Sequence, residues 1–197
     1  LIDFITGLSL VGGVAVSNSS AEIIIGEGTV IEANNVTMFA ASNTEAIVAT
    51  LTFFIGAGVG VTDSDASITI ADGATITTAN DFSMTSFTAD NMDVAAKQGL
   101  LGPSDSGEFF NVCIAVGVSD VDSSARIAGG ATVTAGGDVN VAAFTERRIS
   151  VSASAGAYED GSVGAGVTIS YADADATAAI DGMVHAKGNI TVWADSK

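Results

Sequence analysis

The chain has very few cysteine, proline, histidine and basic residues. Its 197 residues include one cysteine (Cys113), one proline (Pro103), one histidine (His185) and six lysines and arginines. A single cysteine excludes an internal disulfide, and a single histidine excludes a multi-histidine metal site. Because 23 acidic residues oppose those six basic ones, the net charge is −17, which excludes nucleic-acid binding through clustered basic side chains.

Aromatic residues and long apolar runs are also scarce. Aromatics make up 6% of the chain, and no run reaches the ~18 apolar residues of a membrane-spanning helix, so we expect no membrane span. What is abundant is alanine, valine, isoleucine and glycine. Small and β-branched residues favour closely stacked strands over helices. Cys113 lies in such an apolar run, and we expect a packed core thiol or a strand-face residue there.

A motif with a Gly-Ala-Thr turn between alternating aliphatic residues returns four times. In each copy three apolar residues are spaced by six and then two positions, and Val30, Ile76, Val133 and Val184 are matched as the first of the three. The intervals between these residues are 46, 57 and 51 positions. A Gly- and Ala-rich run forms the second half of each period. Internal repetition of this kind indicates a repeat architecture.

A period of about 50 residues divides into two coils of about 25, the usual size of one coil of a parallel β-solenoid. The sequence therefore predicts an all-β fold of about eight coils with strands of about three to six residues, forming a rod about 40 Å long. We expect residues 1–197 to be a single segment of a longer repeat protein, with an insertion loop at about 98–108 around Pro103. A transmembrane barrel is the rival fold, since 150–156 and 163–169 resemble two arms of a hairpin, but barrels need more aromatics.

Acidic pairs end the second half of three of the four periods. The weak candidates for metal ligands are Asp63, Asp65, Asp120, Asp122, Asp173 and Asp175. Alternating aspartates point to one side of a strand or turn and could bind a hard cation such as Ca²⁺. Solubility and turn geometry explain the same pattern without an ion. Because equivalent pairs would recur every second coil, we expect them to lie about 9–10 Å apart, where repulsion is mild.

Basic residues are too scattered to suggest catalysis. They are Lys97, Arg126, Arg147, Arg148, Lys187 and Lys197, and they occupy different repeat positions. We therefore expect no enzyme and no cofactor. The Thr-x-Thr pairs at 75–77 and 132–134 are typical of exposed strands, and the other copies lack them, which argues against an ice-binding array.

Residues 125–143, the run 164–169 and the segment 178–182 resemble the repeats of very large bacterial filamentous adhesins, the filamentous-haemagglutinin-like and leukotoxin-type exoproteins. The resemblance covers almost the whole chain except the loop around Pro103. It implies a right-handed β-helical rod, secreted or exposed at the cell surface as part of a longer polypeptide. Family members usually act in adhesion or aggregation, or carry a distal functional tip.

The sequence thus predicts a structural and interaction module, a stalk segment of a secreted or cell-surface adhesin-like filamentous protein. The expected partners are neighbouring repeats or a homo-oligomeric assembly, and a host or cell-surface receptor or glycan. Two alternatives remain: a carbohydrate-active β-helix enzyme and a Ca²⁺-stabilised extracellular matrix module. The enzyme alternative requires Arg126, Arg147, Arg148 and Lys187 to share one face with acidic groups.

Overall fold

Three parallel four-stranded sheets make up the fold. The structure, a computed structural model, describes residues 10–52, 55–98, 110–156 and 163–197. Sheet A contains four long strands, in the order β1 (Leu10–Ile25), β4 (Ile55–Ile70), β7 (Phe110–Ile127) and β10 (Val163–Ile180), so that β1 and β10 are its edge strands. Sheet B contains the short strands β2 (Val30–Ala33), β5 (Thr75–Thr78), β8 (Thr132–Ala135) and β11 (Met183–Ala186). Sheet C contains β3 (Val36–Thr52), β6 (Phe82–Gln98), β9 (Val139–Ser154) and β12 (Ile190–Ser196).

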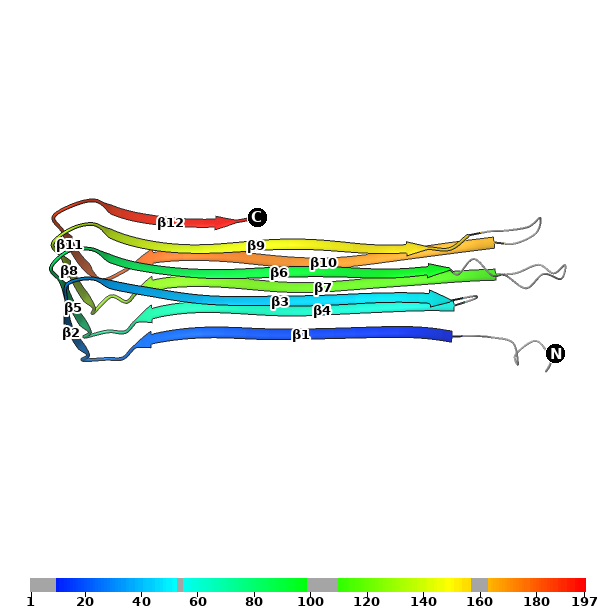
Figure 1. The fold of residues 1–197 in the computed structure, drawn as a ribbon, viewed down its shortest axis with the longest axis horizontal. Coiled ribbons are helices and arrows are strands. Elements are labelled where there is room, and N and C mark those ends of the chain that lie inside the picture. The colour runs from blue at the N-terminus through cyan, green and yellow to red at the C-terminus, as the bar shows by residue number, and fades with distance from the viewer. Residues whose placement is uncertain (1–9, 53–54, 99–109, 157–162) are drawn as a thin grey trace.

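Each coil runs through one strand of sheet A, one of sheet B and one of sheet C before the next coil begins. Neighbours within a sheet are therefore one repeat apart, as in the pairing of β1 with β4 and β4 with β7 (Figure 1). The prediction of an all-β parallel β-solenoid with a repeat of about 50 residues is confirmed. The prediction of two coils per repeat and about eight coils is wrong, because each repeat forms one coil and the described residues form four.

The coil count was wrong because the strands are far longer than three to six residues. The strands of sheet A contain 16 to 18 residues, which corresponds to about 53–60 Å. Four coils stacked about 4.8 Å apart span only about 14 Å between the outer strands. The longest dimension therefore follows the strands, and the predicted 40 Å rod along the stacking axis is not observed (Figure 1). Glycine, serine and aspartate within these runs do not end the strands.

Sheets A and C face each other, and sheet B closes one end of the space between them (Figure 1). One apolar cluster lies near sheet B, where Ile68, Ile70, Ile76 and Phe82 are almost completely buried. Strict alternation along the strands places β-branched and aromatic side chains inward in successive coils, so that equivalent residues stack. Cys113 belongs to a second cluster toward the other end, where burial raises the pKa of its thiol.

The second cluster is thin, because sheet A contributes glycine where the facing strands contribute bulkier side chains. A Cβ atom at Gly60 would lie 2.5 Å from Val94 Cγ2, and one at Gly117 would lie 2.5 Å from Val151 Cγ2. These distances leave no room for a side chain. The glycine runs of the sequence thus allow the two long sheets to approach each other.

The Gly-Ala-Thr motif forms the turn from sheet A to sheet B. Gly28 and Gly73 adopt φ values of 70° and 74° there, which side chains disfavour. Ile31 pairs with Ile76, so the sequence match of Val30 with Ile76 is wrong by one residue. The first copy is one residue shorter between sheets B and C, since Val36 still pairs with Phe82.

Two sequence predictions fall on connections between coils. The insertion loop at about 98–108 lies outside the described residues, apart from Gln98 at the end of β6. The two segments that resemble the arms of a hairpin belong to different sheets, because 150–154 is part of β9 in sheet C and 163–169 is part of β10 in sheet A. These two segments do not pair with each other; β10 pairs in parallel with β7 instead.

Candidate functional site

The six candidate aspartates form two ladders on the outer face of sheet A. Asp63 pairs with Asp120 and Asp120 with Asp173; the second ladder has the order Asp65, Asp122 and Asp175. Alternation points all six away from the core, which confirms that each pair projects to one side. They lie in the middle of long strands, not in turns as expected. In the first coil Asn18 and Ser20 occupy the same positions.

Equivalent aspartates are one strand spacing apart, about 4.8 Å, and the expected spacing of 9–10 Å is wrong because each repeat forms one coil. Charges at this distance repel more strongly than those a Debye length apart. Partial burial and, to a smaller extent, the charges of Asp63 and Asp120 raise the pKa of Asp65. The pKa of Asp122 is also raised, first by partial burial and then by its acidic neighbours, of which Asp120 contributes most.

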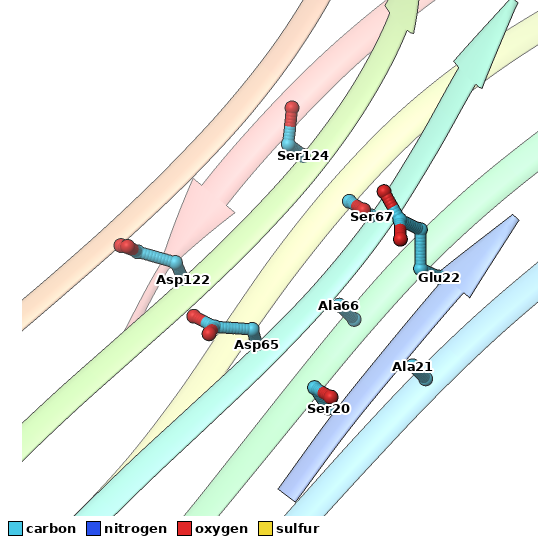
Figure 2. A pocket seen from close by; sticks show the side chains of 8 residues that line it. All are labelled: Ser20, Ala21, Glu22, Asp65, Ala66, Ser67, Asp122 and Ser124. Carbon is cyan, nitrogen blue, oxygen red and sulfur yellow. The ribbon is translucent and has the colours of Figure 1, made fainter. Parts of the chain in front are cut away.

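A shallow pocket of about 350 Å³ lies beside the second ladder. Asp65 and Asp122 point the same way from β4 and β7, and Glu22, Ser67 and Ser124 form the next row toward sheet B (Figure 2). The row therefore combines carboxylates and hydroxyls on a nearly flat surface. Such a surface attracts cations weakly but has no enclosed coordination sphere.

No three carboxylate, imidazole or thiol groups converge closely enough to hold a metal ion within residues 10–52, 55–98, 110–156 and 163–197. Parallel pairing explains this, because it spaces the side chains evenly along a ladder instead of directing them toward one point. A Ca²⁺ ion needs six to eight oxygen ligands at 2.3–2.6 Å, roughly. The acidic ladders therefore provide a charged surface more readily than a metal centre.

The basic residues named for the catalytic alternative do not share a face. Arg126 is on the outer face of sheet A and forms an exposed ion pair of 2.8 Å with Asp181. Arg148 is on the outer face of sheet C, whereas Arg147 on the same strand alternates to the inner side. Lys187 follows β11. His185 is exposed on sheet B in line with Thr134.

Sequence reasoning missed a buried polar layer between the two apolar clusters. Asp90 on β6 is only 3% exposed. Its carboxylate accepts hydrogen bonds from Thr44 Oγ1 at 3.1 Å, Thr62 Oγ1 at 2.7 Å and Ser119 Oγ at 2.5 Å. These donors come from both long sheets and three different coils, so that the layer ties the sheets together. The available signal was that Ser86, Thr88 and Asp90 continue the inward-facing positions of Phe82 and Met84.

A second shallow pocket, of about 430 Å³, lies on sheet C. The residues that surround it include Asn43, Asn91, Glu146 and Arg148, which belong to three successive coils. Ala89 at its centre has a small side chain between larger neighbours, which explains the hollow. Acidic, amide and basic groups are mixed here, and neither this surface nor the acidic ladders define a reaction.

Comparison with protein-family models, with curated proteins and with solved structures found no match for this chain. The described part of the chain also contains no helix of the length and hydropathy needed to cross a membrane. The described residues thus form a parallel β-solenoid of four coils, and the surfaces of these coils are the basis for inferring a function.

Proposed function

We propose that this chain is a structural and interaction module, a β-solenoid stalk segment of a secreted or cell-surface filamentous protein of the adhesin kind. The observation on which this rests is the pairing of consecutive coils in one register along the whole length of their long strands, as from Leu10↔Ile55 to Ile25↔Ile70. A fold of this kind lengthens by adding identical coils, and it presents each outer position as a row.

The end coils support the same proposal. Val141 in the third coil is fully buried, whereas Val192, its partner in the fourth coil, is 46% exposed. Ile190 beside it is 50% exposed. A further coil or another chain stacked on β12 would cover these side chains and pair the free strand edge. Neighbouring repeats are therefore the partners that the end coils fit.

The two alternatives have less support. A carbohydrate-active solenoid enzyme requires acidic and basic groups on one face, but Arg126, Arg147 and Arg148 are on three different surfaces. A Ca²⁺-stabilised module requires converging oxygen ligands, and the aspartate ladders are evenly spaced. We accordingly propose neither of them.

The location of the protein in or outside the cell tests the proposed function. An antibody raised against the folded chain is applied to intact and to permeabilised cells of the organism that encodes it, with an antibody against a cytosolic enzyme as the control. We expect labelling of intact cells that protease treatment of the surface removes, or antigen in the culture medium. Antigen that is detected only after permeabilisation would contradict the proposal.

A further inference from the structure

The outer face of sheet A is divided into an acidic half and an apolar half. We define the apolar patch as the outward residues of 12–16, 57–61, 114–118 and 167–171, which pair in register across all four coils. They include no charged side chain, and apart from Gly12 and Tyr171 all are aliphatic. Val14 is 72% exposed and Ile169 is 54% exposed. An apolar patch of a few hundred Å² is about the largest that a soluble monomer usually exposes, and patches of this size often contact a partner.

Sheet C shows that this composition is specific to one face. At the same level of the molecule its outward residues include Glu45, Asp93, Lys97 and Arg148. The two outer faces belong to one thin molecule, and in the first three coils they have the same alternation and strands of similar length. The absence of charge from the apolar patch therefore does not follow from the fold.

We propose that the apolar patch is a self-association surface, on which a second copy of this chain packs face to face with its long strands running in the opposite direction. A sheet surface of four strands and five residues per strand covers roughly 320 Å² per copy, at strand spacings of about 4.8 Å and residue spacings of about 3.3 Å. Two copies would bury roughly 640 Å², which is below the range of stable interfaces and fits a weak, transient contact, so that we expect a dimer with a dissociation constant of roughly 100 μM or more.

The positions of the acidic ladders favour one of the two possible orientations of the second copy. A two-fold axis parallel to the strands would place the ladders of Asp65 and Asp122 against the same ladders of the second copy, where desolvated like charges repel. An axis parallel to the direction of coil stacking superposes the two apolar patches and sends the acidic ladders to opposite ends. Flat sheets pack face to face about 10 Å apart, so the patch fits a second copy of itself.

A lipid surface is a less suitable occupant for the same reason. Proteins that lie on membranes usually surround an apolar face with basic residues, which anionic lipids attract. Here the border of the patch toward sheet B consists of Asp63, Asp120 and Asp173. Self-association through the outer face of sheet A does not depend on the location of the protein in the cell.

Sedimentation velocity over a range of concentrations tests the proposal. We expect the wild-type chain to shift from monomer to dimer as its concentration rises into the range of hundreds of micromolar, and Val116→Asp to remain monomeric. The matched control is Ser124→Asp, which adds the same charge to the outer face of the same strand beyond the ladders and should still dimerise. Unchanged circular dichroism and melting temperature show that both variants fold.

The relative orientation of the two copies is tested separately, by the distance between nitroxide labels at Ser124→Cys in the dimer. Cys113 is fully buried and stays unlabelled in the folded protein. Eight residues separate Ser124 from the centre of the patch at Val116, so the proposed orientation places the labels about 53 Å apart, whereas the parallel axis brings them within about 20 Å. Four results would each overturn the proposal. The wild-type chain could stay monomeric, or the Val116→Asp variant could dimerise equally well. The label distance could be short, or the monomer could bind phosphatidylcholine vesicles through Val116.

Discussion

Asp65 of β4 and Asp122 of β7 are directly paired neighbours in sheet A, and both point away from the core. Their separation of one strand spacing places two carboxylates side by side, with Asp175 next in the same row. Opposed like charges weaken a sheet. Folding therefore brings together carboxylates that the unfolded chain keeps apart, and the pH dependence of stability should report it.

Replacing Asp122 with asparagine should stabilise the protein at neutral pH. Partial burial and the neighbouring aspartates raise the pKa of Asp122 in the folded state above its ordinary value of 3.8. The folded state thus binds the proton more tightly, so its stabilising contribution is complete below 3.8 and is lost as the pH rises through the raised pKa. Asparagine is uncharged at every pH. We expect a gain of about 1–2 °C in melting temperature, from a few tenths of a kcal/mol for an opposed pair.

Thermal melts of both proteins as a function of pH check this prediction. The difference in melting temperature should shrink on acidification and with added salt, which screens exposed charges. Asp93→Asn is the matched control, because Asp93 pairs with Ile47 and Ser150 and has no carboxylate opposite it. An Asp122→Asn variant that is less stable than wild type at neutral pH would contradict the account.

Calcium should have no specific effect on stability. The ladders space their carboxylates evenly, and no group of three acidic, histidine or cysteine side chains that could hold an ion occurs in the residues that the structure describes. We expect the melting temperature in a chelator to equal that in millimolar Ca²⁺ once ionic strength is matched with NaCl. A saturable rise of several degrees that Ca²⁺ produces and Mg²⁺ does not would revive the Ca²⁺-stabilised alternative.

The carboxylate of Asp90 should be essential for stability. Replacement by alanine leaves Thr44, Thr62 and Ser119 without their shared acceptor in the interior. Buried donors without partners cost about 1–3 kcal/mol each when no water replaces the acceptor, so we expect a loss of about 2–4 kcal/mol. Urea denaturation measures it. Asp93→Ala, on the outer side of the same strand, should change the free energy of unfolding by less than about 0.5 kcal/mol.

The inward glycines of sheet A should not tolerate side chains. At Gly60 a Cβ would lie 2.5 Å from Val94 Cγ2, so Gly60→Val overfills the thin cluster and should destabilise the fold by about 1–3 kcal/mol. Gly12 on β1 faces outward, unlike Gly60. A Cβ atom added at Gly12 would have Ala57 O as its nearest neighbour, at 3.8 Å, which is an ordinary contact distance. Gly12→Val should therefore be close to neutral. Equal effects of the two substitutions in urea denaturation would contradict the assignment of inner and outer faces.

The repeat, the strand class and the equivalence of the aspartate pairs could be predicted from sequence, because alternation and a fixed period are local properties. The number of coils could not. Gly58, Ser64 and Asp65 are typical turn residues, and they suggested short strands. Within β4 they instead continue one strand, because Gly58 makes room for Val94 of the facing sheet and the hydroxyl of Ser64 is hydrogen-bonded to Ser42 in the buried polar layer.

The candidate site was predicted in part. The identity and common direction of the aspartates followed from their spacing, but their distance depended on the coil count and was therefore wrong. The buried role of Asp90 was hidden because Phe87 and Ala89 on the same strand are apolar and point outward. Which face of β6 points inward is set by Met84 and Met92, one before and one after Asp90 in the sequence. The burial of these two residues depends on contacts with other coils.

The central claim is that each repeat forms one coil, so that equivalent residues of consecutive repeats are adjacent. Disulfide formation in the double variant Ser67→Cys/Ser124→Cys tests it most directly. These outward residues pair between β4 and β7, and neighbouring strands about 4.8 Å apart fit the Cα separation of a disulfide. Ser67→Cys/Thr177→Cys is the control, because β7 separates those two strands. We expect mild oxidation to link the first pair within the monomer and leave the second reduced; failure of the first pair to form in the folded protein would contradict the account.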